Sequence, residues 1–338
     1  MEKKKNDFIA QGSILAIASI LVRVMGMIYR IPMTAIIGDK GNGFYSYAYS
    51  VYTILLLLSS YSLPLAVSKM VSAKAQLGQW RNVKRVFICA IAFAIGIGTT
   101  FGLIVLIGAQ FFTRVFFHSE LAAIALRFMA PTILIMALLG VFRGFFQGLQ
   151  NTLPTAVSQI VEGLINAIMS VVFAYFLFDF GHGMDVASGT TDLGYAWGAA
   201  GGAIGTGAGA LAGLIFCFIL FVAYRKILAV NISRDKTGTQ QEYGDIFRLM
   251  LSIALPVILS TALYNLIELV DGSLFNNIMA SKGMEDVKDS MWGAYNAKAL
   301  LLVHIPVSIS SAMAVSLVPT LTAAYALGDE QTAKSKVH

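Results

Sequence analysis

The chain has 338 residues, of which 57% are hydrophobic and 12% charged, with a formal net charge of +6 and a mean hydropathy of +0.74. A soluble domain carries about 25% charged residues, so this composition excludes a soluble globular protein. Several apolar runs exceed the roughly 20 residues that span a bilayer as a helix. They are long and continuous, without the short alternating segments of a barrel. They therefore predict an all-α, polytopic membrane protein.

Eight membrane-spanning helices are predicted in chain order. The start of the chain resembles a signal peptide, but its apolar run continues past Ser19 and contains Arg23, so we interpret it as the first span. Cys89 and Cys217 fall in apolar spans and are interpreted as packing residues. The predicted spans are 8–37, 44–68, 86–113, 120–148, 154–180, 192–224, 245–279 and 291–326.

Basic residues predict how the chain is oriented in the cytoplasmic membrane. With the N-terminus in the cytoplasm, the inner segments hold fifteen lysines and arginines and the outer segments hold four. The inner ones fall within 3–5, 69–85, 225–248 and 334–336, and the outer ones are Lys40, Arg114, Lys282 and Lys288. This bias follows the positive-inside rule. Topology and anionic membrane lipids explain most of the net charge, so we expect no nucleic-acid partner.

An internal repeat occurs at an offset of 250 residues. GFYSYA (43–48) matches GAYNAK (293–298) at its glycine and first tyrosine, and MVSAKAQLG (70–78) falls on TLTAAYALG (320–328) in the same register. The matched segments have the same predicted helix position and sidedness. This agreement favours a parallel repeat over chance matches in apolar sequence.

The repeat predicts the domain organisation. Residues 1–226 would form a six-helix lobe, 227–244 a cytoplasmic linker, and 245–338 the first two helices of an incomplete second lobe. Because the second unit holds two helices against six, we expect the chain to be a fragment, or a short relative, of a longer protein.

The glycine-rich segment GTGAGA (205–210) matches a dinucleotide-binding pattern, but that pattern requires a preceding strand. Here it lies inside an apolar helix. Glycines spaced by four residues, Gly201, Gly205, Gly209 and Gly213, instead predict a small-residue ridge that lets another helix pack closely. No GxxxxGK[ST] sequence occurs, so nothing indicates an ATPase.

Histidines and nucleophiles show no pattern typical of an enzyme or a metal site. Asp179, His182 and Asp185 lie in a predicted outer loop, DFGHGMD, and glycine-rich loops commonly hold such residues without a metal. His304 lies shortly before Pro306 and is interpreted as a packed histidine bonded to a carbonyl that the proline leaves free, with a proton site as the alternative. We therefore expect no enzymatic activity, no metal and no cofactor.

Topology does not explain two arginines in the first span, Arg23 and Arg30. Seven residues separate them, about 10 Å along a helix and about 20° short of two full turns, so they share a face. A charge in hydrocarbon costs at least a few kcal/mol. Pairing with Glu162 or another acid is the structural alternative, but the first six spans hold four such arginines and one such acid. The surplus positive charge predicts a cavity for an anion, because guanidinium N–H groups suit phosphate oxygens.

The seventh span carries three polar side chains at steps of three residues, Asn265, Glu268 and Asp271. They lie near one helix face, spread over about 120°. Uncompensated carboxylates inside a span predict a Na⁺ or H⁺ site that couples transport, and Glu162 is a further candidate for it. Pairing of Glu268 or Asp271 with Lys298 is the structural alternative, and the sequence leaves it open.

Two segments resemble the multidrug/oligosaccharidyl-lipid/polysaccharide (MOP) exporter superfamily. Within that superfamily, they most resemble the stage V sporulation protein B and polysaccharide-biosynthesis branch. RGFFQGLQNTLPTAVSQIVE (143–162) resembles that branch, and VRVMGMIYRIPMTAIIG (22–38) resembles its first helix and that of the lipid II flippases. The resemblance covers about eight helices. It implies two six-helix lobes around a central cavity. It also implies that undecaprenyl-diphosphate-linked sugars, such as lipid II, are transported by alternating access.

The resemblance also implies roles for individual residues. Lipid II flippases carry cavity arginines in helices 1, 2 and 8. Arg23 and Arg30 match the helix 1 pair, with Arg30 slightly displaced, and Lys298 stands in for the arginine of helix 8. Helix 2 departs from the pattern because it carries no basic residue, which leaves the identity of the sugar lipid open. We predict that Arg23 and Arg30 bind the diphosphate, with Lys298 and Arg143 assisting.

Three alternatives to a flippase remain. A cation-coupled multidrug exporter of the same superfamily would favour an acidic cavity, which the excess of arginine opposes. A membrane scaffold without transport activity gains weight from the short second lobe. A membrane glycosyltransferase or polymerase would need a large soluble loop or an acidic catalytic pair, and neither stands out in the sequence.

Overall fold

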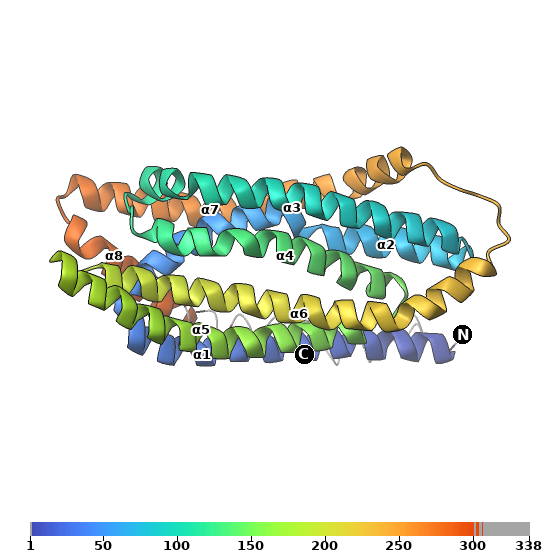
Figure 1. Cartoon of the computed structure of the whole chain (residues 1–338), viewed down its shortest axis with the longest axis horizontal. Coiled ribbons are helices and arrows are strands. Elements are labelled where there is room, and N and C mark those ends of the chain that lie inside the picture. The colour runs from blue at the N-terminus through green and yellow to red at the C-terminus, as the bar shows by residue number, and fades with distance from the viewer. Residues whose placement is uncertain (1, 301, 304–305, 307–338) are drawn as a thin grey trace, which may run out of the picture.

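The computed structural model describes residues 2–300, 302–303 and 306 as an elongated bundle of long helices (Figure 1). The elements are α1 (Glu2–Leu56), a π-helical turn (Leu57–Tyr61), α2 (Leu63–Gln76), α3 (Trp80–Phe117), α4 (Ala122–Gly148), α5 (Leu153–Ser188), α6 (Leu193–Ser233), α7 (Tyr243–Ser281), α8 (Glu285–Ala294) and a second π-helical turn (Tyr295–Ala299). In this described part, no strand occurs and 6 helical stretches are long and apolar enough to cross a membrane. The predicted all-α, polytopic fold class is confirmed.

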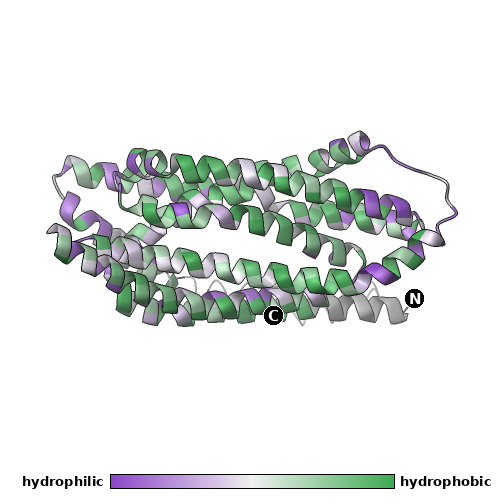
Figure 2. Ribbon diagram, in the orientation of Figure 1, coloured by the Kyte–Doolittle hydropathy of each residue, from purple (hydrophilic) through white to green (hydrophobic). Residues whose placement is uncertain are grey.

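The bundle has two polar ends and an apolar middle (Figure 2). The N-terminus, the turns after α2 and α4 and the loop after α6 lie at one end, called here the N-terminal end (Figure 1). The turns after α3, α5 and α7 lie at the opposite end, called the far end. An apolar band between two polar ends is the arrangement that a bilayer requires of a helical protein.

The first two predicted spans form one helical run with a sharp kink at Gly38. Gly38 has φ 62° and ψ −174°, a conformation open to glycine because it lacks a Cβ atom. The break predicted between residues 37 and 44 is therefore a kink rather than a loop. The second predicted span, 44–68, contains the π-helical turn at 57–61, and α2 continues it beyond residue 68 to Gln76.

The small-residue ridge on α6 packs against α5, as predicted. A Cβ atom added at Gly201 would overlap the backbone of Phe173 and Ala174, and one added at Gly205 would overlap Ser170. At Gly209 the added atom would lie 2.6 Å from the Glu162 carbonyl oxygen. Glycine therefore allows the two helix backbones to approach closely at these positions.

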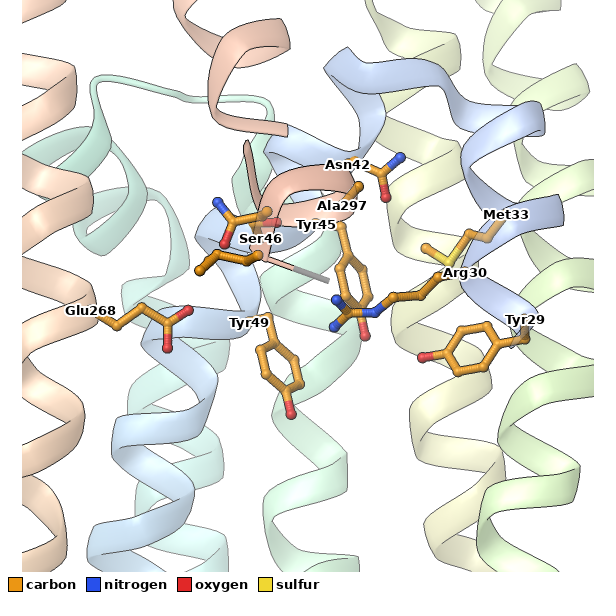
Figure 3. A pocket seen from close by; sticks show the side chains of 11 residues that line it. Tyr29, Arg30, Met33, Asn42, Tyr45, Ser46, Tyr49, Glu268 and Ala297 are labelled. Atoms are coloured by element: carbon orange, nitrogen blue, oxygen red, sulfur yellow. The ribbon is translucent and has the colours of Figure 1, made fainter. Parts of the chain in front are cut away.

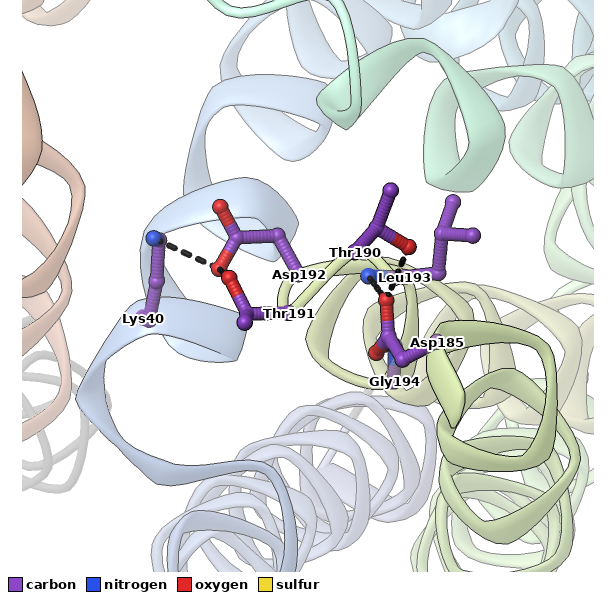
Figure 4. A network of polar contacts seen from close by, with 7 residues as sticks. All are labelled: Lys40, Asp185, Thr190, Thr191, Asp192, Leu193 and Gly194. Atoms are coloured by element: carbon purple, nitrogen blue, oxygen red, sulfur yellow. Dashed lines mark hydrogen bonds and ion pairs between the residues drawn. The ribbon is translucent and has the colours of Figure 1, made fainter. Parts of the chain in front are cut away.

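The predicted outer loop before residue 192 is wrong, because α5 continues as a helix to Ser188. Gly181 serves close packing rather than a loop: a Cβ atom there would lie 2.6 Å from the Leu193 carbonyl oxygen of α6. Asp185 accepts hydrogen bonds from the backbone N–H groups of Leu193, at 3.0 Å, and Gly194, at 2.8 Å (Figure 4). Its carboxylate thus satisfies free N–H groups at the start of α6.

The predicted linker, 227–244, is shorter than expected, because α6 continues to Ser233 and α7 begins at Tyr243. Asp235 fixes the remaining segment to the start of α3. It accepts hydrogen bonds from the Arg81 backbone N–H at 2.9 Å, and from the Thr237 N–H and hydroxyl at 2.9 and 2.6 Å. These donors stabilise the carboxylate and lower the pKa of Asp235 to about 2.

Replacing Asp235 with asparagine is expected to lower thermal stability at pH 7. A carboxyl group whose pKa is depressed on folding contributes stability above its unfolded pKa, here the ordinary 3.8, and loses that contribution as pH falls to about 2. The difference in Tm between the wild type and Asp235→Asn should therefore be constant from pH 7 to about 5 and shrink between about 4 and 2. A Tm difference that does not change with pH in detergent would contradict the assignment.

At the far end, α8 crosses α1 through two glycines that are related by the repeat offset. A Cβ atom at Gly43 would overlap the carbonyl oxygen of Asp289, and one at Gly293 would overlap the carbonyl oxygen of Asp39. Both the glycines and the aspartates are 250 positions apart, so the contact is reciprocal. Most of the predicted eighth span beyond residue 300, including His304, and the second repeat match at 320–328 lie outside the described residues.

Side chains of α8 also fix it to α3. Lys288 donates hydrogen bonds to the carbonyl oxygens of Phe117, at 3.0 Å, and His118, at 2.7 Å, at the end of that helix. Burial lowers the pKa of Lys288. Trp292 stacks on Tyr47, which stacks in turn on Phe117. A cation at the C-terminus of a helix is favourable, so this contact stabilises the closed crossing at the far end.

Candidate functional site

A polar cavity of about 190 Å³ lies beside this crossing, between α1, α7 and the second π-helical turn (Figure 3). Arg30 extends into it from the part of α1 before the kink, and Tyr45 and Tyr49 line it from the part after the kink. Glu268 enters from α7 on the opposite side. The cavity is lined by Tyr29, Arg30, Met33, Asn42, Tyr45, Ser46, Tyr49, Glu268, Asn296, Ala297 and Leu300.

Arg30 is partly buried and forms no ion pair within the described part of the chain. Its neighbours are phenol rings: Tyr45 and Tyr49 stack with ring centroids 5.8 Å apart, and the Tyr45 hydroxyl lies 3.3 Å from the Thr206 hydroxyl. Guanidinium, phenol and amide groups all donate hydrogen bonds. The Arg30 cavity is therefore suited to an anion with several acceptor oxygens.

The predicted coupling residues of α7 share a second, adjoining cavity of about 540 Å³. Asn265, Glu268 and Asp271 line it together, and Glu268 and Asn296 belong to both cavities. Glu268 accepts a long hydrogen bond of 3.4 Å from Ser50 of α1. Within the described residues, neither Glu268 nor Asp271 is paired with Lys298. The structure thus brings three of the four predicted coupling residues together, next to Arg30.

Glu162, the fourth, is the partner of Arg143. The Arg143 guanidinium lies 2.7 Å from the Glu162 carboxylate, and its Nε donates a 2.8 Å hydrogen bond to Ser158. Arg143 is 9% exposed. A charge buried to this degree needs such a partner. The acid that we considered as a partner for Arg23 or Arg30 is therefore used by Arg143, which lines a different cavity.

Lys298 and Arg23 also do not line the Arg30 cavity. Lys298 lies 2.7 Å from the Asp39 carboxylate and its side chain is 58% exposed. Arg23 is exposed, about 10 Å nearer the N-terminal end than Arg30. The four predicted substrate-binding cations all lie in the described residues, and Arg30 is the one that lines this cavity. The structure does not bring Arg23, Arg143 or Lys298 to it.

Sequence reasoning missed the tyrosines of the cavity. The repeat match used GFYSYA (43–48). The tyrosines at 45, 49 and 52 are spaced by four and three and so lie along one helix face, and Tyr45 and Tyr49 of this set line the cavity. That spacing could have indicated a hydroxyl-bearing wall. Asn42 and Asn296 gave no comparable signal.

Solved structures of membrane transporters share this all-helical fold. A MOP superfamily transporter from Pyrococcus furiosus is 16% identical, with a TM-score of 0.60 over 97% of this chain and 67% of that one. An inward-facing multidrug resistance MATE family transporter of the MOP superfamily is 15% identical, with a TM-score of 0.64 over 94% of this chain and 68% of that one. At these identities the likeness shows the fold alone.

The chain belongs to the polysaccharide biosynthesis protein family, whose profile matches residues 8–324. The lipid II flippase MurJ of Bacillus subtilis strain 168 is 26% identical over 337 residues, which is 96% of this chain and 59% of that protein. Stage V sporulation protein B of the same strain is 25% identical over 323 residues, 94% of this chain and 58% of that protein. The chain spans about three fifths of the length of these curated relatives. The predicted resemblance to this branch of the MOP superfamily is confirmed.

Proposed function

We propose that this protein moves a polyprenyl-diphosphate-linked sugar, lipid II or a related envelope precursor, across the cytoplasmic membrane. The observation that carries the proposal is Arg30, a cation without an ion pair among the described residues. Phenol and amide groups line its cavity beside it, and the Glu268 carboxylate lies on the opposite side. A diphosphate supplies the charge and the acceptor oxygens that such a cavity suits. The name of one relative, a lipid II flippase, and the polysaccharide biosynthesis family to which the chain belongs support this substrate class.

Movement of the substrate would follow alternating access. We propose that the N-terminal end faces the cytoplasm, in line with the positive-inside count, and that the far end faces outward. The crossing of α1 and α8 at Gly43 and Gly293 would then close the outer side of the Arg30 cavity. Residues 1–226 and 245–338 would belong to two repeat-related lobes that separate at this crossing to open the cavity.

The second cavity would couple this movement to a cation. Asn265, Glu268 and Asp271 supply amide and carboxylate oxygens, which suit Na⁺, and the carboxylates also suit H⁺. Because Glu268 lines both cavities, a cation bound there would change the charge that an anion beside Arg30 experiences. Glu162, paired with Arg143, takes no part in this proposal.

A cation-coupled multidrug exporter is the second candidate. The observation that favours it is the acidic wall of the larger cavity, with Glu268 and Asp271. An organic cation would bind there by charge, and Arg30 would oppose it from the adjoining cavity. The two candidates therefore differ in the sign of the substrate charge.

The test is transport by the purified protein in proteoliposomes. A fluorescent undecaprenyl-diphosphate sugar is placed in one leaflet, and its movement is measured with a membrane-impermeant quencher, alongside uptake of a cationic dye. Saturable, protein-dependent movement of the lipid without dye uptake is the expected result. Dye uptake without lipid movement would replace the proposal with the exporter. Movement of neither substrate would replace it with a scaffold that does not transport.

A further inference from the structure

A third cavity, of about 240 Å³, lies between the first π-helical turn, α4 and α5. We call it the glutamine cavity and define it by its polar lining residues: Ser60, Arg143, Gln147, Thr155 and Gln159. Leu56 and Met136 add apolar surface. π-helical turns are rare and frequently occur at functional sites, and Ser60 belongs to one.

The charge of the glutamine cavity differs from that of the Arg30 cavity. Its one arginine, Arg143, is neutralised by Glu162 at 2.7 Å, so this pair contributes no net charge. An anion would have to compete with the Glu162 carboxylate for the guanidinium. The cavity therefore does not suit the diphosphate that Arg143 was predicted to bind.

The remaining polar groups suit an uncharged ligand with hydroxyl or amide groups. The Gln159 side-chain oxygen is buried and, within the described residues, accepts no hydrogen bond. The Gln147 amide donates a long bond of 3.3 Å to the Thr155 hydroxyl. Amides and hydroxyls offer both donors and acceptors, and a buried acceptor without a partner is costly, so a ligand donor would stabilise this site.

The glutamine cavity and the Arg30 cavity follow one face of α1. Ser46 and Tyr49 line the Arg30 cavity, and Leu56 lines the glutamine cavity. Tyr49 and Leu56 are seven residues apart, about 10 Å along the helix and about 20° short of two full turns, so their side chains lie on the same face. One elongated molecule lying along this face would reach both cavities.

We infer that the glutamine cavity is a binding subsite for the uncharged, hydroxyl- and amide-bearing sugar of the substrate whose diphosphate binds beside Arg30. This inference rests on the proposed function and adds to it a second point of recognition, toward the N-terminal end. The diphosphate cavity selects for charge, and the glutamine cavity selects for the presence of the sugar. The subsite thus determines specificity among lipids that share a diphosphate.

The experiment measures binding of two lipids to the purified protein in nanodiscs: undecaprenyl diphosphate, and undecaprenyl diphosphate carrying one N-acetylated sugar. The variant Gln147→Leu/Gln159→Leu replaces both amide side chains with apolar ones and removes four hydrogen-bonding groups. We expect its Kd for the sugar lipid to rise about tenfold, the effect of losing about two hydrogen bonds, with its Kd for the bare diphosphate lipid unchanged. Gln110→Leu, an exposed position on α3, is the matched control and should leave both values unchanged.

The outcomes separate the subsite from the proposed function. If the double variant weakens both lipids equally, or neither, the sugar subsite is wrong while diphosphate binding stands. If the wild type binds neither lipid, or if Arg30→Ala binds the bare lipid as the wild type does, the proposed function fails, and the subsite fails with it. The Tm of the double variant is measured as well. A Tm close to that of Gln110→Leu shows that the change in Kd does not come from loss of the fold.

Discussion

Replacing Arg30 with alanine is expected to weaken binding of undecaprenyl diphosphate by about 30- to 150-fold. The substitution removes charge-assisted hydrogen bonds worth about 2–3 kcal/mol in a partly buried cavity. The Arg30 guanidinium has no carboxylate partner among the described residues, so its removal leaves no unpaired acid behind. The loss should therefore appear in ligand affinity and not in thermal stability. Titration of the labelled lipid into nanodiscs measures the first, and a thermal melt the second.

Arg23 provides the matched control on the same helix. It is exposed and does not line the Arg30 cavity, so Arg23→Ala should change the affinity less than about threefold. Arg30→Lys keeps the charge but loses the paired N–H donors, and its affinity should lie between those of the wild type and Arg30→Ala. Equal losses at positions 23 and 30 would favour an attraction that depends on total charge rather than on this cavity.

The contrast between Arg23 and Arg30 shows which features of the site could be predicted from the sequence. Seven-residue spacing correctly places Arg23 and Arg30 near one face of a helix, because that geometry is local. Whether a position on that face meets a cavity depends on what packs against it. Arg30 meets α7 and the second π-helical turn, which come from residues more than 230 positions away. No local pattern contains that information.

The count of intramembrane charges also predicted part of the site. One acid among four intramembrane arginines implied that most of them have no carboxylate partner, and Arg143 is the one of the four that forms an ion pair among the described residues. Which arginine takes the acid depends on the short turn that joins α4 to α5 and brings Arg143 to Glu162. The small-residue ridge was predictable because its spacing is itself the packing surface. Gly181 was misjudged because a glycine in a close helix contact resembles a glycine in a loop.

Replacing Gly43 with leucine is expected to open the far end of the Arg30 cavity. Any Cβ atom at this position overlaps the Asp289 carbonyl oxygen, which belongs to the backbone and has little freedom to move away. Overpacking of this kind costs about 1–3 kcal/mol and would shift the ratio of closed to open states by about 5- to 150-fold. Leucine is a better helix former than glycine, so the change does not weaken α1 itself.

The measurement uses Ser46→Cys, which lines the Arg30 cavity, in a chain whose buried Cys89 and Cys217 are replaced by alanine. A membrane-impermeant maleimide added outside should label Ser46→Cys slowly, and at least about fivefold faster when Gly43→Leu is present. Gly26→Leu is the matched control on the same helix, because a Cβ atom there meets nothing within 4 Å, and it should leave labelling unchanged. Because the contact is reciprocal, Gly293→Leu should reproduce the effect by overlapping Asp39. Unchanged labelling in both Gly43→Leu and Gly293→Leu would mean that the α1–α8 crossing does not close the cavity from outside.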